Sequence, residues 1–257
     1  MKITRLLLSA ALLTSIAVPA ASASVVNSTP AAFVDANAIL KEIDKRTAAF
    51  DDQSYTATMT IIKDGTIKKE LTFEMVMKGL EKQFISFTAP GDVAGMKVLM
   101  QDAETLYVYM PEFKKARRVA AHVQNQGFLG SQFTYEDMTD IGLARKFDAE
   151  VVGREGSETT LELTPKEGIK ATYPKIEIVI DAKKGGVTTM RYFDADDKLV
   201  RQQDRDDWKK IEGVLLPTEV TMTNLKTGEV TKIELGEVKV NQGVEDDLFS
   251  RRMLLRG

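Results

Sequence analysis

The residues best suited to catalysis are few in this sequence, and their spacing does not match a catalytic site. His122 is the only histidine, so it is the one available imidazole base. Ser131 follows nine residues later but lacks the glycine spacing of a nucleophile elbow. Glu136 and Asp137 are adjacent carboxylates, whereas a glycosidase needs two carboxylates set across one site. The sequence therefore predicts a protein that is not an enzyme, with His122 in a solvated loop.

Three aspartates in a short run, Asp194, Asp196 and Asp197, match the start of a calcium-binding loop. An EF-hand would then need an oxygen ligand and a glycine, but Lys198 and Leu199 follow. Such a run is also typical of a hairpin turn. The sequence has no glycine-rich phosphate loop and no dinucleotide-binding fingerprint. It thus predicts a turn with solvated carboxylates, no metal site and no cofactor.

The N-terminus has the three parts of a secretory signal peptide. Lys2 and Arg5 precede an apolar run that ends at Pro19, and small residues occupy the cleavage positions that follow. The apolar run is too short to span a membrane comfortably. We predict that residues 1–23 are a signal peptide cleaved after Ala23. Residues 24–257 are expected to form a single domain in the periplasm.

Composition limits the partners and the forces that hold the fold. The net charge of −3 becomes −5 when Lys2 and Arg5 are removed with the signal peptide. A mildly acidic protein has no bulk attraction for nucleic acid. The chain contains no cysteine, so its core and strand ladders must hold the exported protein without disulfides.

Hydrophobic periodicity predicts one helix followed by a β-rich chain. Apolar residues recur at helical spacing over residues 35–50, and Asp35 is a candidate N-cap. From Ser54 onward the period changes to two, and hairpin signals such as Asp64-Gly65 separate the strands. About a dozen strands imply one meandering antiparallel sheet. They are expected at residues 54–61, 71–78, 84–87, 96–100, 106–110, 147–154, 160–164, 176–181, 187–193, 198–208, 215–224 and 229–240.

Two features of the first half have more than one interpretation. Residues 121–143 lack strand alternation and form a long loop, which in a compact domain is often functional. Methionines cluster in the strands, where Met75 and Met77 share one face, as do Met96 and Met100. Methionine suits surfaces that accommodate variable apolar shapes. A solid core and a greasy cavity produce the same alternation, so both remain open.

A basic stretch also remains open between two interpretations. Lys114, Lys115, Arg117 and Arg118 crowd four positive charges into a short segment. They either contact a lipid headgroup or an acidic partner, or they form a solvated hairpin face. We take Arg117 and Arg118 as the candidate contact residues.

Three segments in the middle of the chain resemble the outer-membrane lipoprotein-sorting protein family, a LolA-like group. They are residues 106–111 (LYVYMP), 115–119 (KARRV) and 128–138 (FLGSQFTYEDM), and their order and spacing carry the resemblance. The mature chain is longer than the best-known lipoprotein carriers of this fold. Outside these segments, cargo-binding positions cannot be matched residue by residue.

The resemblance implies a mainly β fold, in which a curved, incomplete antiparallel β-barrel of about 11 to 12 strands carries a helical lid. It also implies a periplasmic carrier that binds the acyl chains of a lipoprotein or lipid, with transient membrane contact and an inner-membrane RND-type exporter as partner. We expect these side chains to line the cavity: Met59, Phe73, Met75, Met77, Met96, Val98, Met100, Val108 and Met110. We expect these in the lid and loop: Ile39, Ile43, Phe128, Leu129, Phe133 and Tyr135.

The alternative hypothesis is a periplasmic module that senses lipid and regulates a membrane partner. A carrier should co-purify with acyl lipid and pass it on, whereas a sensor should bind a membrane regulator stably and transfer nothing. An acyl chain requires only a greasy pocket, because each buried methylene contributes about 0.8 kcal/mol. Neither hypothesis requires a catalytic group.

Overall fold

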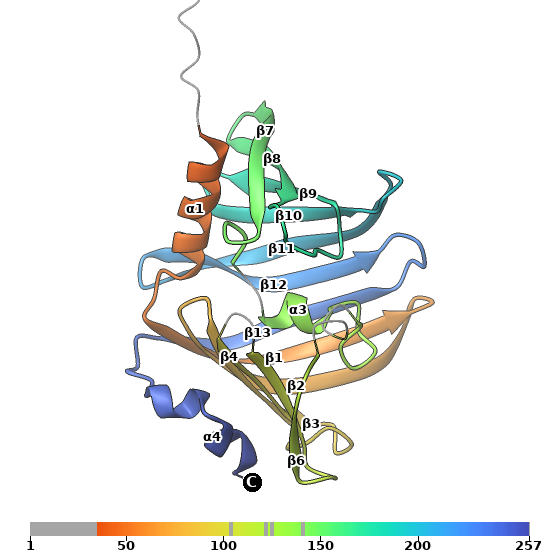
Figure 1. Ribbon diagram of the computed structural model, residues 1–257, viewed down its shortest axis with the longest axis vertical. Helices are drawn as coiled ribbons and strands as arrows, with labels where there is room; N and C mark the ends of the chain where they lie inside the picture. Colours follow the sequence, from red (N-terminus) through yellow and green to blue (C-terminus); the bar gives the residue numbers. More distant parts are fainter. Residues whose placement is uncertain (1–34, 103–104, 121–122, 124–125, 140–141, 257) are drawn as a thin grey trace, which may run out of the picture. The chain divides into compact units, whose positions relative to one another are not determined.

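Thirteen strands form one antiparallel sheet in the computed structural model of the chain (Figure 1), which describes residues 35–102, 105–120, 123, 126–139 and 142–256. The strand order is β6-β5-β4-β3-β2-β1-β13-β12-β11-β10-β9-β8-β7. Every neighbouring pair is consecutive in the chain except β1 and β13. The two ends of the sheet, β6 and β7, remain unpaired with each other, so the barrel is open. The predicted incomplete barrel is confirmed.

The structure has one strand more than the sequence predicted, and most of the strands are longer than predicted. The extra strand is β6, whose sequence KARR has no apolar alternation and was interpreted as a contact surface or a solvated hairpin face. The strands are β1 (Asp52–Lys63), β2 (Thr66–Lys78), β3 (Lys82–Ala89), β4 (Lys97–Asp102), β5 (Thr105–Met110), β6 (Lys115–Arg118), β7 (Phe147–Glu155), β8 (Glu158–Pro165), β9 (Lys175–Asp181), β10 (Gly186–Phe193), β11 (Leu199–Ile211), β12 (Val214–Asn224) and β13 (Val230–Val240).

The two faces of the sheet bury different sets of side chains. On one face, called the inner face here, Met75 pairs with Ile85, Ile85 with Val98, and Val98 with Val108. These four side chains belong to the main core. On the outer face, Phe84, Leu99 and Tyr109 form a smaller cluster with Phe249 and Leu254. Alternation with period two separates the two clusters.

Short helices cover both faces. α1 (Ala36–Thr47) begins at Asp35, whose carboxylate accepts a hydrogen bond from the Asn37 N–H, and it buries Leu40 and Ile43. It packs on the main core beside β7 and β10. The 3₁₀ helix η1 (Asp246–Phe249) and α4 (Arg251–Leu255) supply the apolar residues of the outer cluster. The sequence predicted α1 and its cap but not the outer pair.

The connection from β6 to β7 must pass from one edge of the sheet to the other. Its helix α3 (Tyr135–Thr139) lies in front of the middle of the sheet in Figure 1. Phe128 is fully buried, with its ring centroid 5.6 Å from that of Phe87 on β3 and 4.9 Å from that of Tyr135. The segment that breaks the strand pattern is therefore a cover over part of the inner face.

Asp52 ties the start of β1 to the chain that leaves β13. Its buried carboxylate accepts hydrogen bonds from the backbone N–H groups of Gln242, Gly243 and Val244 at 2.8–2.9 Å. Burial opposes ionisation, but these donors and Lys78 lower the pKa of Asp52 below its ordinary value of 3.8. The carboxylate thereby fixes the path toward η1 and α4.

We predict that Asp52→Asn lowers the free energy of unfolding by about 2 kcal/mol at pH 7, because an amide cannot accept all three charge-assisted bonds. The pKa of Asp52 is lowered in the folded protein, so its contribution is present above the ordinary pKa. It is lost as the pH falls below about 4. Urea denaturation at pH 7 and pH 3 measures this. Asp51→Asn, an exposed neighbour, is the control, and an equal effect of both variants at pH 7 contradicts the assignment.

Candidate functional site

A cavity of about 540 Å³ lies between the inner face of the sheet and α1. This volume falls within the range of about 300–1,000 Å³ that is typical of small-molecule sites. Its lining is mostly apolar in the part formed by the sheet. Phe73, Met75 and Met77 of β2 lie there, and Ile233 and Leu235 come from β13. The five residues therefore form an apolar wall from two strands far apart in sequence.

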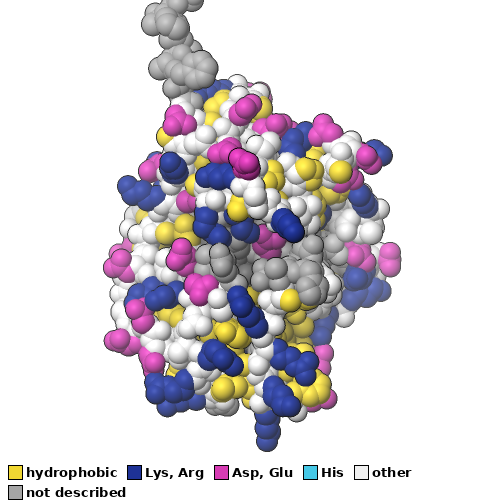
Figure 2. Space-filling view, viewed as in Figure 1, with side chains coloured by type: hydrophobic (Ala, Val, Ile, Leu, Met, Phe, Trp, Pro, Cys, Tyr) yellow, Lys and Arg dark blue, Asp and Glu magenta, His cyan; other side chains and the backbone are white. Residues whose placement is uncertain are grey.

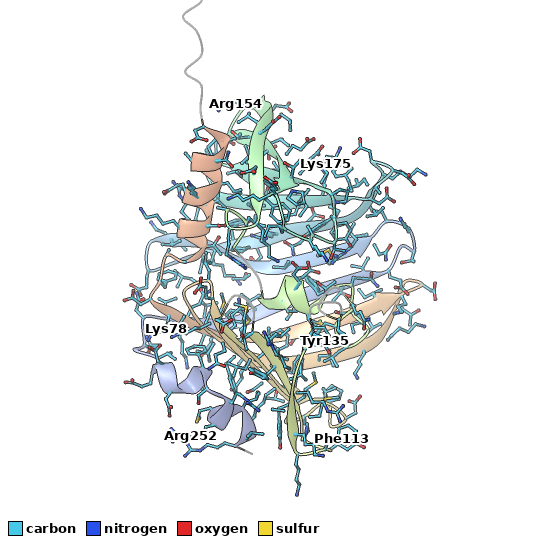
Figure 3. All side chains as sticks on the ribbon, viewed as in Figure 1. Lys78, Phe113, Tyr135, Arg154, Lys175 and Arg252 are labelled. Atoms are coloured by element: carbon cyan, nitrogen blue, oxygen red, sulfur yellow. The ribbon has the colours of Figure 1, made fainter. Side chains whose placement is uncertain are left out.

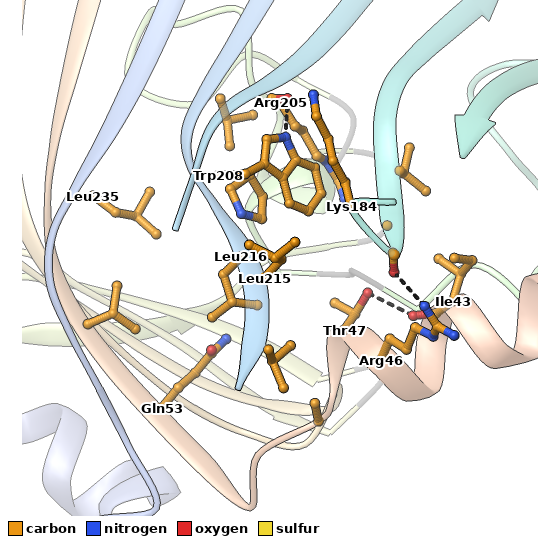
Figure 4. Close-up of a pocket in the computed structure, with 18 of the residues that line it drawn as sticks. Ile43, Arg46, Thr47, Gln53, Lys184, Arg205, Trp208, Leu215, Leu216 and Leu235 are labelled. Atoms are coloured by element: carbon orange, nitrogen blue, oxygen red, sulfur yellow. Dashed lines mark hydrogen bonds between the residues drawn. The ribbon is translucent and has the colours of Figure 1, made fainter. Parts of the chain in front are cut away.

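The mouth of the cavity lies between the C-terminal end of α1 and the β9–β10 turn, beside the β11–β12 hairpin (Figure 4). Arg46 donates a hydrogen bond to the carbonyl oxygen of Gly185 at 3.4 Å. The Lys184 ammonium lies 5.6 Å from the centre of the Trp208 ring. A Cβ atom at Gly186 would lie 2.8 Å from Trp208 Cη2, so only glycine allows the indole this position. The mouth is thus aromatic and cationic.

The β11 strand places a polar stripe on the inner face. Arg201, Gln203 and Arg205 alternate along it, and Arg201 and Gln203 pair with Tyr192 and Met190 of β10. Arg201 and Gln203 are each only 6% exposed. The alternation along the strand turns these three side chains inward and Asp204 and Asp206 outward. An inward cationic stripe is unusual because buried charges require compensation.

Arg201 fastens the crossing segment to the sheet. Its guanidinium donates to Asp137 Oδ2 at 2.7 Å, to the Gln132 carbonyl oxygen at 2.6 Å and to the Tyr173 hydroxyl at 3.0 Å. Burial disfavours this cation, but Asp137 and Tyr173 raise the pKa of Arg201 above its ordinary value. The Gln132 side chain also bonds to Asn224 at the end of β12 and to Glu229 in the β12–β13 turn. The segment is therefore fastened through polar as well as aromatic contacts.

Arg205 has no comparable partner. Its Nε donates to Gln203 Oε1 at 3.1 Å, and its Nη2 lies 3.4 Å from Met190 Sδ. In the described part of the chain no carboxylate reaches it. Burial consequently lowers the pKa of Arg205. Arg205 lines the cavity, and the hydrogen-bond partners of its guanidinium in the described part of the chain are neutral.

Comparison with known proteins shows the family and the fold of this chain. A family model described only as "Uncharacterized protein" matches residues 79–256, well over half of the chain. The chain belongs to that family. A comparison with curated proteins gave no significant match. The fold is LolA-like, as three solved structures show.

The three structures cover almost all of their own length. A DUF1329 family protein from Desulfovibrio piger is 22% identical with a TM-score of 0.78, over 85% of this chain and 97% of that one. A protein domain from Vibrio parahaemolyticus, described as outer membrane lipoprotein-sorting, is 20% identical with a TM-score of 0.79, over 86% and 98%. The LolA superfamily protein of Nitrosomonas europaea is 20% identical with a TM-score of 0.71, over 86% and 99%. At these identities the likeness establishes the fold.

Only some of the residues expected to line the cavity of this LolA-like chain do so. Phe73, Met75 and Met77 line it from the sheet, and Ile43 and Phe133 line it from α1 and the crossing segment. The structure places the others elsewhere. Met59, Met96, Val98, Met100 and Val108 are packed in the main core, and Met110 is 39% exposed at the end of β5.

The expected lid and contact residues are also divided. Phe128 is part of the core, with Ile39, Leu129 and Tyr135 partly buried against it. Figure 3 shows Tyr135 on α3 in front of the sheet. Arg117 and Arg118 are exposed on the edge strand β6. Sequence reasoning missed Trp208, Arg205 and the residues 213–217 of the mouth, because it searched for the cavity only in the first half of the chain.

The residues with other proposed chemistry are accounted for in separate places. Glu136 pairs with Lys146, whereas Asp137 pairs with Arg201, so these carboxylates do not face one another across a site. Asp194 accepts hydrogen bonds from the backbone of Asp196 and Lys198, as a hairpin turn requires. His122 and the predicted signal peptide lie outside the described residues.

The described residues contain neither a cluster of metal-ligating side chains nor a membrane-spanning helix. No three His, Cys, Asp or Glu side chains among them are grouped as metal ligands. No helix within the described ranges has both the length and the apolar character needed to cross a membrane.

We predict that Arg201→Met costs about 3 kcal/mol of unfolding free energy, because it leaves Asp137 as a buried carboxylate without its cation. Adding Asp137→Asn in the same chain should recover part of the loss. Chemical denaturation measures both. Arg205→Met is the matched control on the same strand and face, and its loss should stay below about 1 kcal/mol, because no ion pair breaks there. Equal losses in the two single variants would refute the role given to Arg201.

Proposed function

We propose that this protein is a non-enzymatic periplasmic carrier that binds the acyl chain of a lipid or lipoprotein and moves it between membranes. The observation that carries the proposal is the cavity of about 540 Å³ between the sheet and α1. A hydrocarbon chain that leaves water and packs against the apolar wall of the cavity gains about 0.8 kcal/mol of free energy per buried methylene. The predicted signal peptide and the LolA-like fold support the same proposal.

Transfer requires the cover of the cavity to move. α1 is held by a few polar contacts, among them Asp44, which accepts hydrogen bonds from the backbone of Leu143 and Ala144, and Asn37, which accepts one from Ala149. Its buried apolar residues are few. Such a helix can open without unfolding the sheet. Because a carrier alone cannot set a direction, we further propose an energised inner-membrane partner of the RND type.

We predict that Met75→Glu abolishes binding of acyl chains while the fold is kept, because it places a carboxylate against the apolar wall where a chain would lie. Met75 is 4% exposed and lines the cavity. Displacement of a fluorescent fatty acid measures binding, and circular dichroism checks the sheet.

Thr88→Glu on β3 is the matched control, since it adds the same charge at an exposed position on the adjacent strand. The control should bind like the unmodified protein. If a folded Met75→Glu protein binds acyl chains as well as the unmodified protein, the cavity is not the acyl-binding site. Binding without transfer between vesicles would favour the sensing module over the carrier.

The β6 edge is the part of the surface that we propose touches the membrane. Exposed basic residues surround it, and Arg251 of α4 lies with its guanidinium carbon 5.0 Å from the centre of the Tyr107 ring. Phe113 in the β5–β6 turn is 54% exposed. In Figure 2, Lys and Arg side chains gather at the lower end of the molecule with hydrophobic ones among them. Basic and exposed aromatic side chains together fit an anionic lipid surface.

We predict that Arg117→Glu weakens binding to phosphatidylglycerol-containing vesicles about thirtyfold, because each basic residue near an anionic surface contributes about 1 kcal/mol and charge reversal doubles the change. Arg154→Glu on the other edge strand, β7, is the control, and Figure 3 shows Arg154 at the end of the view opposite to Phe113. Vesicle co-sedimentation at low and high salt measures binding. Equal effects of the two variants would contradict a specific docking edge.

A further inference from the structure

We propose that the guest of the cavity carries an acidic group, a carboxylate or a phosphate ester, and that Arg205 binds this group. The inference rests on the proposed function and narrows its cargo to long-chain acyl anions. It stands on the position of one cation inside the cavity and on the lack of a charged hydrogen-bond partner for it among the described residues.

The two inward arginines of β11 form an internal comparison. Arg201 has a carboxylate, a backbone carbonyl and a hydroxyl as acceptors. Arg205, four residues further on, has one amide oxygen and one thioether sulfur. Its Nη1 donates no hydrogen bond to the described part of the chain, although Arg205 lines the cavity. Arg201 therefore has a carboxylate counter-ion within the fold, although its buried Nε has no hydrogen-bond partner, whereas Arg205 has no counter-ion among the described residues.

The charges that line the cavity leave a positive excess. Four cationic side chains contribute, namely Arg46, Lys183, Lys184 and Arg205, of which Arg46 is already paired with Glu42 outside the lining. The two carboxylates in the lining, Asp44 and Asp137, are already bonded to backbone N–H groups and, for Asp137, to Arg201. A desolvated cation without a counter-ion is costly, and a bound anion would offset that cost.

The surroundings of Arg205 indicate how a guest would lie in the cavity. Trp208, three residues beyond Arg205 on the same strand, lines the mouth, and the Trp208 indole N–H donates to the Arg205 carbonyl oxygen at 2.9 Å. The apolar wall of Phe73, Met75 and Met77 is part of the same cavity. A molecule with one acidic head and one chain matches this arrangement, because the planar guanidinium holds carboxylate or phosphate by two parallel bonds.

The test compares four probes by isothermal titration calorimetry on the mature protein. They are palmitate, hexadecyl phosphate, the neutral hexadecanol and inorganic phosphate. We expect both chain-bearing acids to bind at least about tenfold more tightly than hexadecanol, as a charge-assisted hydrogen bond allows. Arg205→Met should bring palmitate to the level of hexadecanol and leave hexadecanol binding unchanged. Lys209→Met, an exposed cation on the same strand, should change none of the four.

Each outcome decides one claim. If palmitate and hexadecanol bind equally to the unmodified protein, the acidic-guest proposal is wrong and the carrier proposal stands. If no chain-bearing probe binds, the carrier proposal fails. If inorganic phosphate binds as tightly as hexadecyl phosphate, the site takes a free anion, and the claim about acyl anions is overturned. Arg205→Lys, which keeps the charge, should retain part of the preference for acids if Arg205→Met does not fold.

Discussion

One topological constraint governs this molecule: the chain must pass from one free edge of a 13-stranded sheet to the other. β6 and β7 are the two edges, so the segment between them has to cross a face of the sheet. It crosses the inner face and places Phe128 against Phe87 of β3. The part of the inner face beneath it becomes a closed core. The part beside it, under α1, retains a cavity.

Electrostatics make this division stable. A crossing segment with little regular secondary structure buries polar backbone groups that need partners. Arg201 supplies partners at the middle of the sheet, since it binds the Gln132 carbonyl oxygen and Asp137 together. Polar side chains on the inner face thus anchor the segment that closes one side of the cavity. Arg205, the next inward-facing arginine on the same strand, lines the cavity.

The sequence was a good guide to elements and a poor guide to the cavity, for physical reasons. Period two and period 3.6 follow from backbone geometry, so α1 and twelve strands were predictable. The charged strand β6 and the short outer helices η1 and α4 were missed. Met75 and Met100 have the same inward register and the same burial, yet only Met75 lines the cavity. What distinguishes them is the long-range packing above each strand, and no local pattern encodes this packing.

The polar stripe of β11 shows a different limit. Asp204 and Asp206 lie on the face of β11 opposite to Arg201, Gln203 and Arg205, so alternation along the strand could have indicated the inward set. A rule that charged residues avoid interiors argues against that inference. Such departures from the usual pattern are expected where a protein binds something, because the compensating partner comes from outside the fold.

The central claim is that the space under α1 holds an acyl guest in the native protein. Native mass spectrometry of the protein, purified without detergent from its own cell envelope, tests this most directly. We predict a mass above that of the mature chain, which falls to the chain mass on extraction with organic solvent and releases an acyl compound. A protein that carries only its own mass, and that takes up no acyl compound when one is supplied, would contradict the account.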